Sequence, residues 1–132
     1  MEVETWPLAH RPESVGIARQ IARSLLECWE MDSDQADAVL LVVSELVTNS
    51  IEHAEPPVTL HLYRERIGWR VWVGITDGGP THQGARTMGQ DDEHGRGLVI
   101  VRALATAHGS RAHAKGTTHW AHLPIRTKSR PA

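Results

Sequence analysis

Apolar residues recur at helical spacing in two stretches of the first half of the chain. The first stretch starts at Ser14, which we predict to be an N-cap, and continues to Glu30. The second follows Asp32-Ser33-Asp34, whose side chains can cap a helix, and runs to about Ala54. Pro56-Pro57 ends it, because proline cannot continue a helix. The apolar positions of the first predicted helix are Ala18, Ile21, Ala22, Leu25 and Leu26.

The other apolar segments mostly alternate with polar residues, which is the pattern of half-buried strands. A third predicted helix runs from Leu98 to Ala107. Helices that gather against an antiparallel-rich sheet indicate an α+β fold. We expect a two-layer sandwich in which a mixed, mostly antiparallel sheet is covered on one face by about three helices. The predicted strands are Val3 to Ala9, Val58 to Glu65, Trp69 to Thr76, Ser110 to Lys115 and Thr117 to Pro124.

Length, charge and cysteine content narrow the class of protein. The 132 residues fit a single domain, 1–132, in which Arg126 to Ala132 form a polar tail that we expect to be disordered. A net charge of −2 gives no basic patch, which argues against direct nucleic-acid binding. Cys28 is the only cysteine, so no internal disulfide can form, and a reducing cytoplasm fits. We predict no signal peptide and no membrane span, because no long apolar run follows the acidic N-terminus.

One side of the second predicted helix carries a row of polar residues. Glu45, Asn49 and His53 fall at i, i+4 and i+8, so they lie along the same side. The rest of the helix is mostly apolar, and we therefore expect this row to face a cleft within the protein. A carboxylate, an amide oxygen and an imidazole in a cleft can hold a metal ion and activate a hydroxyl group. A solvent-exposed polar stripe is the alternative.

Three glycine-containing motifs follow this helix. Asp77-Gly78-Gly79 comes directly after a strand, where a carboxylate can accept a hydrogen bond from an exocyclic amino group and glycines let a flat base approach. Gly95-Arg96-Gly97 precedes the helix that starts near Leu98, and free N–H groups at a helix N-terminus bind phosphate. Gly116-Thr117-Thr118 opens the last strand. Gly78 to His94 shows no periodicity and is predicted to be a mobile lid.

Each motif alone also fits a plain turn or a glycine-rich helix entry. In this order, however, the polar helix and the three motifs resemble the GHKL ATPase superfamily. That group includes gyrase-type and Hsp90-type ATPases, histidine kinases, and the small serine kinases that act as anti-sigma factors. The resemblance covers Ser14 to Pro124. It implies the histidine-kinase-like ATPase fold, with ATP and Mg²⁺ as cofactors.

The resemblance also implies roles for single residues. Asn49 matches the magnesium ligand of the superfamily, Glu45 its general base, and His53 a position along the nucleotide. Asp77 matches the aspartate that reads adenine, and Thr117 supports the same base. The remaining positions that match nucleotide-binding residues are Gly79, Gly95, Arg96, Gly97 and Leu98.

Within the superfamily, the stand-alone anti-sigma-factor serine kinases match best, because their glutamate, asparagine and histidine-alanine pattern appears here as Glu45, Asn49 and His53-Ala54. Sensor histidine kinases often carry a basic residue where Glu52 stands, and too few residues precede the first helix for their phosphoacceptor segment. The resemblance implies a cytoplasmic protein that holds a sigma factor inactive and phosphorylates a serine or threonine of an antagonist protein. Relatives of this kind often form homodimers.

Two other interpretations stay open. The first is a catalytically weak nucleotide-binding interaction module of the same fold, which the departures from the family pattern at Glu52 and Thr81 favour mildly. The second is a small metal-binding protein that uses the nine histidines, although no Cys-x-x-Cys or His-Glu-x-x-His pattern supports zinc. The five tryptophans coincide with a complete lack of phenylalanine, so we expect tryptophans to fill the core.

Overall fold

The structure is a computed structural model that describes residues 3–65, 70–81 and 99–124. Five strands form one sheet in the order β1-β2-β3-β5-β4, and each pairing is antiparallel. Residues 99–104 form a further helical segment. The bounds of the elements are β1 Glu4–Leu8, α1 Ser14–Cys28, α2 Ser33–His53, β2 Val58–Glu65, β3 Arg70–Asp77, β4 Ala107–His113 and β5 Gly116–Pro124.

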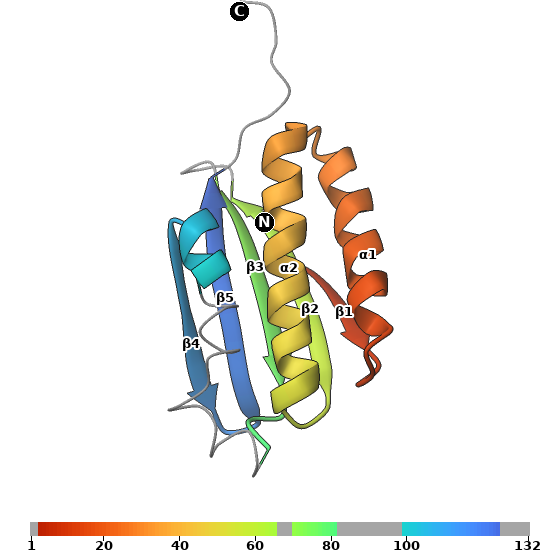
Figure 1. Cartoon of the computed structure of the whole chain (residues 1–132), viewed down its shortest axis with the longest axis vertical. Helices are drawn as coiled ribbons and strands as arrows, with labels where there is room; N and C mark the ends of the chain where they lie inside the picture. The colour runs from red at the N-terminus through yellow and green to blue at the C-terminus, as the bar shows by residue number, and fades with distance from the viewer. Residues whose placement is uncertain (1–2, 66–69, 82–98, 125–132) are drawn as a thin grey trace, which may run out of the picture.

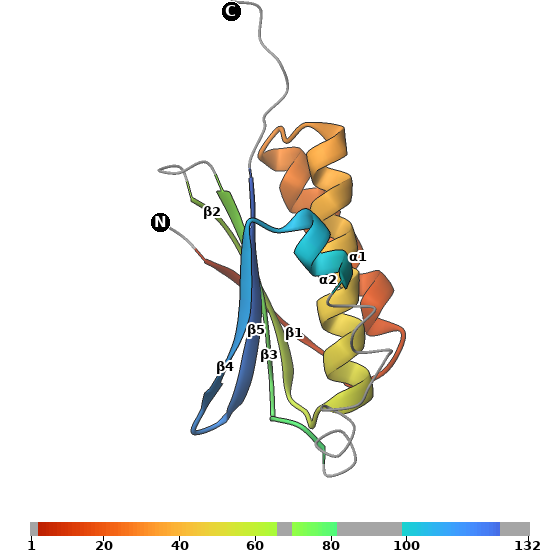
Figure 2. The same cartoon turned by 60° about the vertical axis from the view of Figure 1, so that its left-hand side comes forward.

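The helices lie on one face of the sheet. Figure 1 shows α1 and α2 side by side in front of it, with the helical segment 99–104 next to α2. The turned view shows that no described element lies over the opposite face (Figure 2). The predicted two-layer α+β sandwich is therefore confirmed, although the described strands pair in antiparallel fashion throughout rather than in a mixed sheet.

Helix α1 begins one residue earlier than the predicted Ser14 cap implies. Glu13 is the N-cap, and Ser14 is the first helical residue. The Ser14 hydroxyl donates a hydrogen bond back to the carbonyl oxygen of Ala9 at 2.6 Å, so it ties the helix to the end of β1 instead of capping it. The residues that α1 buries include Ala18, Ala22 and Leu26, as the helical spacing predicts.

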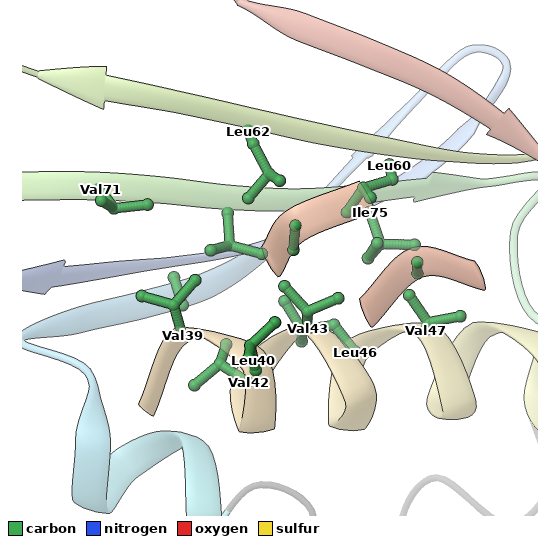
Figure 3. Close-up of a cluster of buried hydrophobic side chains, with 14 of the residues drawn as sticks. Val39, Leu40, Val42, Val43, Leu46, Val47, Leu60, Leu62, Val71 and Ile75 are labelled. Carbon is green, nitrogen blue, oxygen red and sulfur yellow. The ribbon is translucent and has the colours of Figure 1, made fainter. Parts of the chain in front are cut away.

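Helix α2 is capped as predicted and packs its apolar side onto the sheet. The Asp32 carboxylate accepts a hydrogen bond from the Asp34 N–H at 2.9 Å. Figure 3 shows the valine and leucine side chains of α2 facing those of β2 and β3. Full burial of each such side chain contributes about 1.5–3 kcal/mol relative to leaving it exposed. The buried residues of α2 are Val39, Leu40, Val42, Val43, Leu46, Val47 and Ser50.

Strand β3 alternates between the two faces of the sheet. Val71, Val73 and Ile75 are fully buried on the face that the helices cover, and Asp77 ends this series. Trp72 therefore points to the uncovered face, as does every second residue of β3 counted from it. The same alternation puts Ala121 and Leu123 of β5 on the covered face.

Three further sequence predictions are wrong. Strand β4 runs from Ala107 to His113 rather than from Ser110 to Lys115. The third helix ends at residue 104 rather than at Ala107, because Ala107 already begins β4 and the Thr106 N–H donates to the His122 carbonyl at 2.8 Å. Tryptophans do not fill the core: Trp6 and Trp29 pack only at its margin, and Trp72 and Trp120 lie on the uncovered face. Valines and leucines occupy the space between α2 and the sheet instead.

Trp69 and the predicted tail from Arg126 to Ala132 lie outside the described residues. Within the described ranges, no helix is both long enough and apolar enough to cross a membrane.

Candidate functional site

The polar row predicted on α2 is half-buried. Glu45, Asn49 and His53 each have an exposure between that of the core and that of open surface, so they do not form a fully solvent-exposed stripe. The side chains of Glu45 and Asn49 form no hydrogen bond or ion pair with any described residue. His53 Nε2 lies 3.8 Å from Glu52 Oε1. Half-buried polar atoms without a protein partner are available to a ligand.

Backbone hydrogen bonds join the end of α2 to the turn after β3. The Glu55 N–H donates to the Gly79 carbonyl at 2.8 Å, and the Gly78 N–H donates to the Glu55 carbonyl at 2.7 Å. The Thr81 N–H donates to the His53 carbonyl at 2.9 Å. These bonds hold the Asp77-Gly78-Gly79 motif against the helix that carries the polar row.

Asp77 is buried and fully engaged in hydrogen bonds. Its Oδ2 atom accepts from the Ser50 hydroxyl at 2.5 Å and lies 3.2 Å from His119 Nε2, while its Oδ1 atom accepts from the Gly79 N–H at 2.9 Å. Burial alone would raise the pKa of Asp77, but the hydrogen bonds from His119, Ser50 and Gly79 outweigh it and lower the pKa below the ordinary value. The carboxyl group is therefore ionised and acts only as an acceptor.

The ionised state of Asp77 fixes the tautomer of His119. Because a carboxylate only accepts, His119 Nε2 must carry the hydrogen that points at Asp77. The Ser110 hydroxyl is hydrogen-bonded to Nδ1 of the same ring at 2.8 Å. Hydrogen bonds thus connect Ser110, His119 and Asp77.

The glycines of the two flanking motifs have separate roles. A Cβ atom on Gly78 would collide with the carbonyl oxygen of Pro56, and one on Gly116 would collide with the carbonyl oxygen of Asp77, so both glycines are needed for close backbone packing. Gly79 has a φ of +96°, and among the described residues a Cβ built there would meet only the Gly116 Cα atom, at 3.8 Å. Within the described part of the chain, the backbone at Gly79 is therefore more open to a flat ligand than the backbone at Gly78.

Thr117 lies beside Asp77 in the sheet. The two residues are directly paired across β3 and β5, so both side chains belong to the face that the helices cover. Thr118, the next residue, points to the other face, where its hydroxyl bonds that of Thr76 at 2.9 Å. The structure thus brings together the predicted residues Asp77, Gly79 and Thr117.

Sequence reasoning missed the two side chains that bind Asp77. Ser50 occupies a buried position of α2 in line with Val43 and Val47, and a polar residue at a core position signals a buried partner. His119 is separated from Ala121 and Leu123 by steps of two residues along β5, so it lies on the same covered face as they do. Both signals were present in the sequence, but neither names the partner.

Three predicted features lie outside the described residues. They are the phosphate-binding motif Gly95-Arg96-Gly97, the neighbouring Leu98 and most of the predicted lid. In the described part of the chain, no group of three or more histidine, cysteine, aspartate or glutamate side chains is placed to hold a metal ion.

Comparison with known proteins relates this geometry to one family. Residues 8–122 match the model of the histidine kinase-like ATPase domain. The chain is 35% identical over 112 residues to the sensor histidine kinase PdtaS of Mycobacterium tuberculosis, in the CDC 1551 / Oshkosh and the H37Rv strains. That alignment covers 76% of this chain and only 22% of each kinase, so the chain spans about a fifth of these curated relatives.

A solved structure has the same fold. It is the crystal structure of the RsbU and RsbW domains of Rv1364c from Mycobacterium tuberculosis, with a TM-score of 0.75 and 20% sequence identity. The match covers 100% of this chain and 34% of that one. The chain therefore belongs to the family of histidine kinase-like ATPase domains, which are ATP-binding domains.

Proposed function

We propose that this chain is a cytoplasmic protein kinase that binds a sigma factor and uses Mg-ATP to phosphorylate a serine or threonine of an antagonist protein. The observation that carries the proposal is the pair Glu45 and Asn49, which lie one helical turn apart, half-buried, without a side-chain partner among the described residues. The match of these residues and of His53-Ala54 to the anti-sigma-factor serine kinases supports the choice of class.

The donor atoms of the polar row fit magnesium and phosphoryl transfer. Mg²⁺ usually takes one or two protein oxygens and keeps several waters, and the amide oxygen of Asn49 would supply one such ligand. Bound Mg-ATP supplies the phosphoryl group and neutralises part of its charge. The carboxylate of Glu45 would accept the proton of the attacking hydroxyl group. His53, one further turn along α2, would lie beside the nucleotide.

Asp77 would read the base. Its ionised carboxylate accepts hydrogen bonds, which suits the exocyclic amino group of adenine and not the carbonyl oxygen of guanine. The side chain of Asp77 has no exposed surface, so a base can reach it only after a local movement. His119 makes the longest of the three contacts to Asp77 and its side chain is 19% exposed, so His119 would be the group that moves. Thr117 and Gly79 would flank the bound base.

The phosphate contacts of the proposal rest on the sequence. Gly95, Arg96 and Gly97 precede the predicted helix start at Leu98. Free N–H groups and a guanidinium at that position would hold the phosphates of ATP.

The experiment that tests the proposal is transfer of labelled phosphate from ATP to candidate antagonist proteins of the host. Glu45→Gln removes the basic oxygen and keeps the shape, so we expect transfer to fall by ~10²-fold or more while ATP binding is retained. Glu27→Gln is the matched control, because Glu27 is exposed on α1 and has no part in the proposed site. Equal rates for wild type and Glu45→Gln would remove Glu45 from the mechanism. ATP binding without any transfer would favour the catalytically weak interaction module.

The similarity to sensor histidine kinase PdtaS favours a second candidate function, transfer of phosphate to a histidine. The same assay separates the two. A phosphorylated product that survives acid carries phosphoserine or phosphothreonine, whereas phosphohistidine is lost in acid and survives base. Acid-stable label on a separate protein is the result that we expect.

A further inference from the structure

The uncovered face of the sheet has a floor made of two tryptophan rings. A Cβ atom on Gly74 would collide with the end of the Trp72 ring, and one on Gly109 would lie 2.9 Å from Cζ2 of Trp120. Each ring therefore lies flat against the sheet above a glycine. We call Trp72 and Trp120 the tryptophan floor. Tyr63 and His122 extend it, with ring centroids 5.7 Å from Trp72 and 5.4 Å from Trp120.

The tryptophan floor forms the base of a hollow on β3, β4 and β5. The volume of the hollow is about 720 Å³. Small-molecule sites usually measure about 300–1,000 Å³ and combine aromatic walls with a few polar groups. The lining residues are Trp72, Arg111, His113, Thr118, Trp120 and His122.

Among the described residues, the lining carries one permanent positive charge and no carboxylate. That charge is Arg111, whose guanidinium is exposed and forms no ion pair or hydrogen bond with any residue in the described ranges. Arg70, the other described guanidinium on this face, is already bound to Glu65 at 2.6 Å. Burial, together with Arg70, lowers the pKa of His122, so its ring is neutral near pH 7. The hollow thus presents a flat aromatic surface with a single unpaired cation.

We infer that this hollow binds a small planar aromatic anion, whose ring stacks on the tryptophan floor and whose carboxylate or phosphate pairs with Arg111. Stacking on tryptophan suits any flat π-system, and a guanidinium pairs with planar acidic groups through two parallel hydrogen bonds. A second copy of the chain is a poorer occupant, because a two-fold interface on this face would bury two Arg111 guanidinium groups while the described lining of the hollow offers no carboxylate to pair with them. A nucleic acid strand would need more than one unpaired cation along its path.

The hollow and the candidate nucleotide site are back to back. Thr118 lines the hollow and its hydroxyl bonds that of Thr76 at 2.9 Å, while the neighbouring residues Asp77 and Thr117 point to the covered face. The inference does not depend on the proposed function, and the experiment is performed without nucleotide so that the two can fail separately.

The experiment is calorimetric titration of the full chain with three probes of similar size. These are 2-naphthoate, the neutral alcohol 2-naphthalenemethanol, and cyclohexanecarboxylate, which has the charge without the aromatic ring. We expect 2-naphthoate to bind at least about tenfold more tightly than either control, since each control lacks one of the two interactions. No binding of 2-naphthoate, or equal binding of all three, would overturn the inference.

Variants locate the binding site. Arg111→Gln should weaken 2-naphthoate binding about tenfold or more, whereas Arg23→Gln, on the exposed side of α1, should leave it unchanged. Trp120→Leu should weaken it at least about fivefold. Gly109→Ala keeps both tryptophans but pushes the Trp120 ring off the sheet, and it should weaken binding even if Trp120→Leu fails to fold. Equal effects of Arg111→Gln and Arg23→Gln on binding would contradict the inference. It would also be contradicted if 2-naphthoate did not bind and the wild-type chain formed a dimer that Trp120→Leu dissociates.

Discussion

The two faces of the sheet differ in what their side chains are bonded to. On the covered face of β3, Val71, Val73 and Ile75 pack against α2, and the polar group that ends the series, Asp77, has three hydrogen-bond partners. On the uncovered face of the same strand, Trp72 lies flat over Gly74 and forms part of the floor of an open hollow. One strand thus provides a sealed core on one side and an open aromatic surface on the other.

The covered face therefore contributes mainly to the stability of the fold, whereas the uncovered face is available to bind a ligand. Among the described residues, the covered face holds the buried apolar side chains and leaves no fully buried side-chain polar atom without a partner, while Glu45 and Asn49 are half-buried and unpaired. The uncovered face retains an unpaired guanidinium, Arg111, beside its rings. We therefore expect substitutions on the covered face to lower stability or nucleotide binding, and substitutions on the uncovered face to change little except binding in the hollow.

The largest effect should come from neighbouring residues of β2 that point to opposite faces. Leu62 is fully buried on the covered side, and Leu62→Ala should lower the free energy of unfolding by about 2–5 kcal/mol through lost burial and the cavity left behind. Tyr63 is half-buried and contacts Trp72, so Tyr63→Ala should cost less than ~1.5 kcal/mol. Urea unfolding followed by circular dichroism measures both. Equal losses would contradict the division between the faces.

The next effect concerns the polar end of the covered face. Asp77→Asn removes the charge from the group proposed to read adenine, so ATP binding should weaken by about 1.5–3 kcal/mol. Wild type should prefer ATP to GTP, and the variant should lose much of that preference. Asp37→Asn, exposed on α2, is the matched control. Calorimetric titration with both nucleotides measures the effect, and equal affinity of wild type for ATP and GTP would remove Asp77 from base recognition.

The fold was predictable because the helices and strands depend mostly on the local spacing of apolar residues along the chain. Helical spacing located α1 and α2, and alternation located β2 to within its observed bounds and β3 to within one residue. The Ser14 cap was misplaced because its hydroxyl bonds back to Ala9, a tertiary choice that an N-cap pattern does not encode. The position of Trp120 also depends on strand register, because its ring lies over Gly109 of the neighbouring strand.

The candidate site was predictable only in part. The motif around Asp77 pointed to a carboxylate at a strand end, and the structure places it there. The network around it joins α2, β3 and β5 through Ser50, Asp77 and His119, which are far apart in sequence. A linear pattern identifies the members of such a network by type, but only folding determines which atoms meet. The roles of Glu45, Asn49 and the Gly95-Arg96-Gly97 motif stay predictions.

A pair of glycines gives a smaller effect on stability. Gly116 has a φ of +149°, and a side chain there would collide with the backbone of Asp77, so Gly116→Ala should cost more than ~1 kcal/mol. At Gly74 the three atoms nearest to the added carbon belong to the end of the Trp72 ring, which can move, so Gly74→Ala should cost less than Gly116→Ala. Thermal unfolding of the two variants compares them directly. A larger loss for Gly74→Ala would mean that the tryptophan floor is rigid and contributes to stability.

The smallest effect should be the response of the two faces to pH, because it comes from single groups whose opposing influences partly cancel. On the uncovered face, burial lowers the pKa of His61 and His122 below 6.5, so the unfolded chain binds protons that the folded chain does not. Stability should therefore fall as the pH drops below 6.5. On the covered face, the lowered pKa of Asp77 stabilises the fold above its ordinary value of 3.8, and this contribution is lost as the pH falls through the folded-state pKa.

Two variants test which face of the sheet causes the change in stability in each of these two pH ranges. A double variant, His61→Gln with His122→Gln, should flatten the loss of stability between about pH 7 and pH 5, because it removes the groups that titrate there. Ser50→Ala removes one of the hydrogen bonds that lower the pKa of Asp77, so its stability should depend less on pH below 3.8 than that of wild type. Urea midpoints measured from pH 7 to pH 3 distinguish the variants. If Ser50→Ala altered the higher window, or the histidine variant the lower one, the titrating groups would lie elsewhere than on these two faces.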